Sequence, residues 1–141
     1  MQEEINYSPE THPVIAIDLD GTIWDEDYPN TAIPYFKSIE TINKMIEIGY
    51  EVIIFTARGE ENLKACKWTL IDEFGLNPNV KFNQHSNYYT SLYPISSPKI
   101  NASVYFEDKA FNAPNYKTEW PNIYNKFCKE KWSEELKHKR K

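Results

Sequence analysis

Short apolar runs alternate along the chain with stretches whose apolar residues recur at helical spacing. Four such runs predict strands: Val14-Ile15-Ala16-Ile17, Tyr50 to Phe55, Val80 to Phe82 and Val104-Tyr105-Phe106. The first run is continuously apolar, which is typical of a strand buried on both faces of a sheet. The pattern therefore predicts a sheet whose central strands have no exposed face.

The stretches between these runs predict helices. Apolar residues have helical spacing from Pro34 to Gly49 and from Glu60 to Phe74, and we expect a closing helix from Pro121 onward. A basic tail, Lys137 to Lys141, ends the chain. Strands that alternate with helices need crossover connections, so we predict an α/β fold with a central, mostly parallel sheet covered on both faces.

The composition is that of one folded domain. The chain has 141 residues, of which 40% are hydrophobic, enough for a single core. We divide it into a polar leader (1–12) and one domain (13–141). The formal net charge of −5 argues against strong general binding of nucleic acid. Cys66 and Cys128 lack metal-ligand spacing, so we expect both to be reduced and packed.

No part of the sequence predicts contact with a membrane. The N-terminus has neither the basic start nor the apolar core of a signal peptide, and no apolar run approaches the length that spans a bilayer. We therefore expect a cytoplasmic protein.

Polar residues gather at the carboxyl ends of three predicted strands. Asp18 and Asp20 follow the first, Thr56 the second and Asp108 the last. In open parallel sheets ligands bind beyond these ends, near the point where the strand order reverses. We therefore expect one functional site there.

The run Asp18-Leu19-Asp20-Gly21-Thr22 has the acids that phosphoryl transfer needs. Asp18 could attack phosphorus and form an aspartyl-phosphate, which splits one difficult displacement into two easier ones. Asp20 could protonate the leaving group and then activate water. Magnesium is usually held by one or two carboxylates plus substrate phosphate, so we expect Mg²⁺ on Asp18, Asp108 and the backbone carbonyl of Asp20.

Other residues complete the predicted site. Thr56 could donate a hydrogen bond to a phosphoryl oxygen, and Lys99 could supply a positive charge, so we count both as catalytic. Arg58 is a second candidate cation, and we predict that Gly21, Thr22 and Arg58 contact the substrate.

In their order along the chain, these residues resemble the haloacid dehalogenase superfamily of phosphohydrolases. The resemblance runs from Val14 to Phe111: the segment from Asp18 to Thr22 matches the first motif, Thr56 the second, Lys99 the third and Glu107-Asp108 the fourth. It is greatest to small phage-type members and polynucleotide 3′-phosphatases, whose fourth motif usually reads Asp-Asp. It implies a three-layer α/β/α, Rossmann-like fold and the catalytic roles described above.

The spacing of the motifs leaves no room for the cap domain that many members of this superfamily insert. Thr56 follows Asp18 by 38 positions, which one loop, one helix and one strand use up. Lys99 follows Thr56 by 43 positions, which leave only a small lid, for which Tyr88 to Tyr93 is the candidate. An open site suits bulky substrates. We therefore predict a magnesium-dependent phosphatase whose substrate is a phosphorylated small molecule, a nucleotide or a nucleic-acid 3′-phosphate.

Two alternatives stay open. A receiver-type signalling module uses similar residues, but its phosphorylated Asp ends the third strand, where this sequence has Lys81-Phe82-Asn83. The other is a catalytically inactive domain of the same fold that serves for interaction, which the presence of both Asp18 and Asp20 disfavours.

Overall fold

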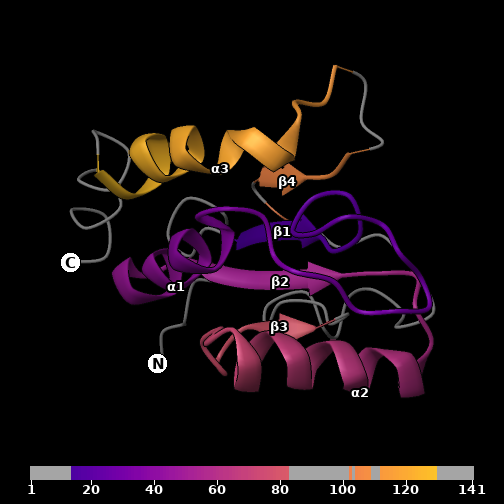
Figure 1. The fold of residues 1–141 in the computed structure, drawn as a ribbon. Helices are drawn as coiled ribbons and strands as arrows, with labels where there is room; N and C mark the ends of the chain where they lie inside the picture. The colour runs from indigo at the N-terminus through magenta and orange to yellow at the C-terminus, as the bar shows by residue number, and fades with distance from the viewer. Residues whose placement is uncertain (1–13, 83–101, 103, 109–111, 130–141) are drawn as a thin grey trace.

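Four parallel strands form the sheet in a computed structural model of the chain, which describes residues 14–82, 102, 104–108 and 112–129. The strands are β1 (Val14–Asp18), β2 (Glu51–Phe55), β3 (Lys81–Phe82) and β4 (Val104–Phe106). Their order across the sheet is β3-β2-β1-β4, and each neighbouring pair is parallel. The predicted parallel α/β sheet is therefore confirmed (Figure 1).

The helical segments connect and cover these strands. They are α1 (Ser38–Ile48), α2 (Glu60–Trp68) with the π-helical η1 (Thr69–Glu73), and α3 (Tyr116–Tyr124) with the π-helical η2 (Asn125–Lys129). Figure 1 shows α1 beside α3, whereas α2 runs along β3.

The first helix is shorter than predicted at its start and ends where predicted. Lys37, which precedes α1, has a left-handed backbone with φ 73°, so the helix cannot extend back to Pro34. Gly49 has φ 119°, and its N–H donates to the carbonyls of Met45 and Ile46. This is the glycine stop that the sequence predicted.

The closing helix begins five residues earlier than predicted, at Tyr116, and Pro121 lies inside it. The side chain of Asn115 accepts a hydrogen bond from the N–H of Lys117 (3.1 Å) and so caps the helix. Trp120, one residue before the proline, is fully buried. We infer that the cap and this burial offset the one backbone hydrogen bond that Pro121 cannot donate.

The main core lies on one face of the sheet, and every described helical segment contributes to it. Ile15 and Ile17 of β1 point to this face, whereas Val14 and Ala16 point to the other, where they form a smaller cluster with Ile53. The helical residues of the main core are Ile42, Met45, Cys66, Leu70, Tyr116, Trp120, Ile123, Phe127 and Cys128. The described residues thus form a sheet with helices on one face, and the predicted third layer stays a prediction.

The order of the strands reverses between β1 and β4. From β1 the chain moves outward through β2 to β3, and it returns to form β4 on the opposite side of β1. A ligand site is expected at this switch point, outside the carboxyl ends of the strands. Asp18 ends β1 and Asp108 follows β4 by two residues, so both acids lie there.

Cys66 and Cys128 are buried and neither forms a disulfide, as predicted. Within the described ranges, none of the helices has the length and apolar character needed to cross a membrane.

Candidate active site

The carboxyl groups of Asp18 and Asp108 are close enough to affect each other. The pKa of Asp18 is raised to about 7, first by burial, then by the charge of Asp108 and by hydrogen bonding between the two carboxyls. A hydrogen bond from the N–H of Leu19 to Asp18 Oδ1 (2.9 Å) opposes this rise. Two neighbouring acids that interact in this way favour either a shared proton or a bound cation.

One oxygen of Asp108 is buried without a partner. Among the described residues, no group forms a hydrogen bond with Asp108 Oδ1. The carboxylate also approaches the backbone of Gly21 so closely that a Cβ at that position would collide with it, and Gly21 has φ 85°. The close approach and the left-handed turn explain why glycine is needed. The predicted contact of Gly21 with substrate stays a prediction, since its N–H donates to the carbonyl of Trp24 (2.7 Å).

The carboxylate of Asp20 is held by different partners. Arg58 donates from Nη2 to Asp20 Oδ1 (2.7 Å) and from Nε to Oδ2 (3.0 Å), and the indole N–H of Trp24 donates to Oδ1 (3.1 Å). A two-point contact between guanidinium and carboxylate fixes orientation as well as distance. Asp20 is therefore locked in one direction by a residue 38 positions away.

Arg58, which we predicted to contact substrate, is buried and paired with other residues of the protein. Its side chain is 2% exposed. Besides Asp20, its guanidinium donates to Asn62 Oδ1 (2.6 Å), the carbonyl of Asn30 (2.9 Å) and Cys66 Sγ (3.2 Å). All five N–H groups of an arginine are then directed at protein atoms. In this structure Arg58 holds Asp20, and the predicted contact of Arg58 with substrate stays a prediction.

Thr22, which we also predicted to contact substrate, is fully buried. Its carbonyl accepts a hydrogen bond from the indole N–H of Trp120 (2.8 Å), so this residue ties the motif to α3. The side chain has no exposed surface here, and the predicted contact of Thr22 with substrate stays a prediction.

The structure places Thr56 directly after β2, which pairs with β1 so that Phe55 is opposite Asp18. Its hydroxyl oxygen accepts a hydrogen bond from the N–H of Arg58 (3.2 Å). This contact fixes the hydroxyl at the carboxyl edge of the sheet. Lys99, the remaining predicted catalytic residue, lies outside the described residues.

Three site residues were missed in the sequence. Trp24 and Asn30 belong to a segment that we treated only as a loop, and Asn62 to a helix that we gave no role. Asn62 lies in the first turn of α2, but Arg58 precedes that helix by two residues, so helical spacing gave no signal for their contact. No sequence pattern indicated the hydrogen bond from Trp24 to Asp20, because this bond depends on the turn at Gly21.

The residues present fit a magnesium ion with few protein ligands. Within the described part of the chain, no three His, Cys, Asp or Glu side chains form a group that could hold a metal. Magnesium often needs only one or two carboxylates together with substrate phosphate. Asp108 Oδ1, which has no hydrogen-bond partner among the described residues, and the neighbouring carboxyl of Asp18 could supply that smaller set. The part that we predicted for the backbone carbonyl of Asp20 stays a prediction.

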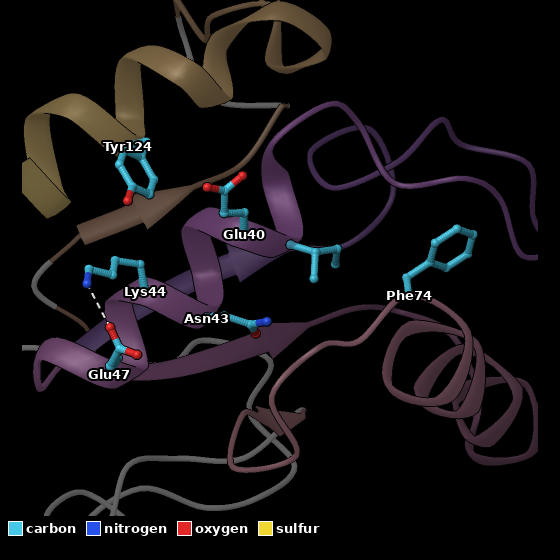
Figure 2. A pocket seen from close by; sticks show the side chains of 7 residues that line it. Glu40, Asn43, Lys44, Glu47, Phe74 and Tyr124 are labelled. Atoms are coloured by element: carbon cyan, nitrogen blue, oxygen red, sulfur yellow. Dashed lines mark hydrogen bonds and ion pairs between the residues drawn. The ribbon is translucent and has the colours of Figure 1, made fainter.

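Two grooves of about 480 Å³ lie outside this site. Figure 2 shows the first, where Tyr124 of α3 and Phe74 flank the exposed face of α1, and where Lys44 is paired with Glu47 (2.7 Å). The second lies between β4 and α3. Neither is lined by the predicted catalytic residues, and the paired charges of the first are typical of a solvated helix face.

Comparison with known proteins supports the fold alone. No protein-family model matches the sequence, and no curated protein matches it. A solved structure described as a conserved protein coded by a locus from Bacteroides thetaiotaomicron is similar, with a TM-score of 0.65 and 22% identity. The similarity covers 81% of this chain and 88% of that one.

Proposed function

We propose that this protein is a magnesium-dependent phosphomonoesterase of the haloacid dehalogenase type, and that Asp18 is its nucleophile. The main support is the pair of Asp18 and Asp108 at the switch point, beside a separately held Asp20. One oxygen of Asp108 is buried there and has no hydrogen-bond partner among the residues that the structure describes. The capless three-layer architecture and the cytoplasmic location belong to the same proposal.

In this proposal Asp18 carries out the first chemical step. One carboxylate oxygen of Asp18 attacks phosphorus, the bond between phosphorus and the leaving oxygen breaks, and an aspartyl-phosphate forms. Bound Mg²⁺, held by Asp18, Asp108 and the backbone carbonyl of Asp20, would neutralise charge on the phosphoryl oxygens. The hydroxyl of Thr56 donates to a phosphoryl oxygen and helps to orient it.

Asp20 moves the protons in both steps. It gives a proton to the leaving oxygen, so that an alcohol departs, and its carboxylate then takes a proton from the water that attacks the aspartyl-phosphate. Phosphate leaves and the carboxylate of Asp18 is restored. The contacts from Arg58 and Trp24 fix the orientation of the Asp20 carboxyl group. Oδ1 accepts two hydrogen bonds and Oδ2 one, so the second lone pair of Oδ2 is the place for the transferred proton.

A substrate panel tests the proposal. The purified chain would be incubated with p-nitrophenyl phosphate, sugar phosphates, nucleotides and 3′-phosphorylated oligonucleotides, with magnesium or with EDTA. We expect phosphate release only with magnesium, its loss in Asp18→Asn, and its retention in Asp27→Asn, which alters an exposed acid of the segment between β1 and α1. Release from no substrate, as an inactive interaction domain would give, or full activity of Asp18→Asn would refute the proposal.

A further inference from the structure

The loop between Asp20 and α1 exposes an unusual share of apolar surface. Of the five large hydrophobic side chains that are exposed in the described part of the chain, three belong to this loop: Tyr28 (60%), Ile33 (76%) and Phe36 (75%). The loop runs along the end of the sheet at which the strand arrows point (Figure 1). The exposed surface therefore lies at the edge of the sheet that holds the candidate site.

Of these three side chains, Tyr28 packs against Arg58, the residue that holds Asp20. Its ring centroid lies 5.4 Å from the guanidinium carbon of Arg58, and the ring of Trp24 lies 5.8 Å from the same carbon. Trp24 is fully buried, whereas Tyr28 is mostly exposed. Tyr28 thus packs against the buried arginine of the pair formed by Arg58 and Asp20, while most of its own surface is exposed to solvent.

The backbone next to Tyr28 is fixed although its ring is exposed. The carbonyl of Pro29 accepts a hydrogen bond from Asn62 Nδ2 (2.7 Å), and that of Asn30 accepts one from Arg58 Nη2 (2.9 Å). The N–H of Asn30 donates to the carbonyl of Asp27 (2.7 Å), which closes a turn around Tyr28. An exposed aromatic ring on an anchored backbone has a low entropy cost of binding, as a preorganised contact surface requires.

We propose that Tyr28 stacks on the leaving group, and that the preferred substrates carry a planar ring, a nucleobase above all, close to the phosphate. This inference rests on the proposed function, because Asp20 must touch the leaving oxygen to protonate it and Tyr28 lies against the arginine that holds Asp20. Stacking on an aromatic ring tolerates different bases. The site therefore selects nucleotides or nucleic-acid ends as a class, without preference for one base.

The test compares substrates with and without a ring. KM and kcat would be measured for the wild type, Tyr28→Ala, Tyr28→Phe and Phe36→Ala, with a nucleoside 3′-monophosphate, a 3′-phosphorylated oligonucleotide and glycerol 2-phosphate. We expect Tyr28→Ala to raise the KM of the ring-bearing substrates about tenfold relative to that of glycerol 2-phosphate. Tyr28→Phe, which keeps the ring, should restore the wild-type ratio.

Phe36→Ala is the matched control, since it removes a similarly exposed ring from the same loop. In Phe36→Ala, the ratio of KM for ring-bearing substrates to KM for glycerol 2-phosphate should equal that of the wild type. A higher kcat/KM for the oligonucleotide than for the mononucleotide would identify a nucleic-acid end as the preferred ring-bearing substrate. The reverse order would identify a free nucleotide.

Two results would overturn the inference alone, provided that the wild type is active. In the first, Tyr28→Ala leaves the ratio of KM for ring-bearing substrates to KM for glycerol 2-phosphate unchanged. In the second, Phe36→Ala changes this ratio as much as Tyr28→Ala does. A wild type that releases phosphate from none of the substrates would instead overturn the proposed function, and the inference with it.

Discussion

Asp18 and Asp20 are separated by a single residue and have opposite surroundings. Asp18 is buried against another acid, Asp108, and the pKa of Asp18 rises to about 7. Asp20 accepts three hydrogen bonds, two from Arg58 and one from Trp24. The first acid lies where a cation would relieve repulsion, whereas the second already has a cation beside it. The difference teaches that environment, more than residue type, divides the roles of two neighbouring carboxylates.

The turn after β1 produces this difference. Leu19, between the two acids, is fully buried, and its N–H donates to the carbonyl of Phe55 (3.1 Å) on β2. Gly21 then adopts a positive φ and reverses the chain. On a continuing strand Asp18 and Asp20 would point to the same side. The turn instead gives each acid its own set of neighbours.

Among variants that change the surroundings of only one of the two acids, Asp18 or Asp20, we expect the largest loss of turnover from Asp108→Asn. In the proposed enzyme this change removes a magnesium ligand, so turnover should fall by at least about 10²-fold. Titration of activity against magnesium concentration measures it. Glu107→Gln, which alters the neighbouring acid, should keep magnesium-dependent turnover, and equal losses in both variants would contradict the assignment of Asp108.

Asp108→Asn should raise the stability of the folded protein, although it lowers turnover. The pKa of Asp18 is 3.8 unperturbed and about 7 in the folded protein, so the folded state binds the proton more tightly than the unfolded state. Without metal, the free energy of unfolding should therefore fall as pH rises from about 4 to about 7. Asp108→Asn lowers the pKa of Asp18 and should add about 1 kcal/mol at pH 8. Urea unfolding in EDTA at pH 5 and pH 8 measures this, and a less stable variant at pH 8 would contradict it.

A smaller effect is expected from loss of the arginine that holds Asp20. Arg58→Gln should lower kcat by about 10- to 10²-fold, with a larger loss for alkyl phosphates than for p-nitrophenyl phosphate, whose leaving group needs less protonation. Stability should fall by about 2 kcal/mol, because a partly buried carboxylate loses its partner. Lys81→Gln, which breaks a 2.8 Å ion pair with Glu51, is the control. Equal losses on both substrates would show that Arg58 only supports the fold.

The smallest effect is expected from Trp24→Phe, which removes one hydrogen bond to Asp20 and keeps a ring in the core. Stability should fall by about 1 kcal/mol, and kcat by less than about tenfold with the same bias toward alkyl phosphates. Trp120→Phe is a matched control, since its indole is equally buried but donates to the carbonyl of Thr22. A leaving-group bias in that control would contradict the role given to Trp24.

The sheet could be predicted from the sequence because its signal is local. The apolar runs gave β1 and β4 within one residue, and the helical spacing gave α1 and the α2–η1 segment. The start of α3 could not be predicted in this way. We took Pro121 as a helix start, but a side-chain cap and burial of Trp120 on the sheet outweigh the proline.

The site was predictable only in its outline. Strand ends and parallel topology were enough to bring Asp18, Thr56 and Asp108 to one edge of the sheet. The contact between Arg58 and Asp20 joins residues 38 positions apart, and no local pattern specifies it. For that reason the sequence did not predict that Arg58 holds Asp20.

Trapping the covalent intermediate tests the central claim most directly, namely that Asp18 attacks and Asp20 moves protons. Asp20→Asn would be mixed with substrate and magnesium, quenched in acid and digested, and its peptides would be mapped by mass. The account predicts slow phosphorylation, stalled release and one phosphoryl group on Asp18. Phosphate release at the wild-type rate, or a phosphoryl group on another residue, would contradict it.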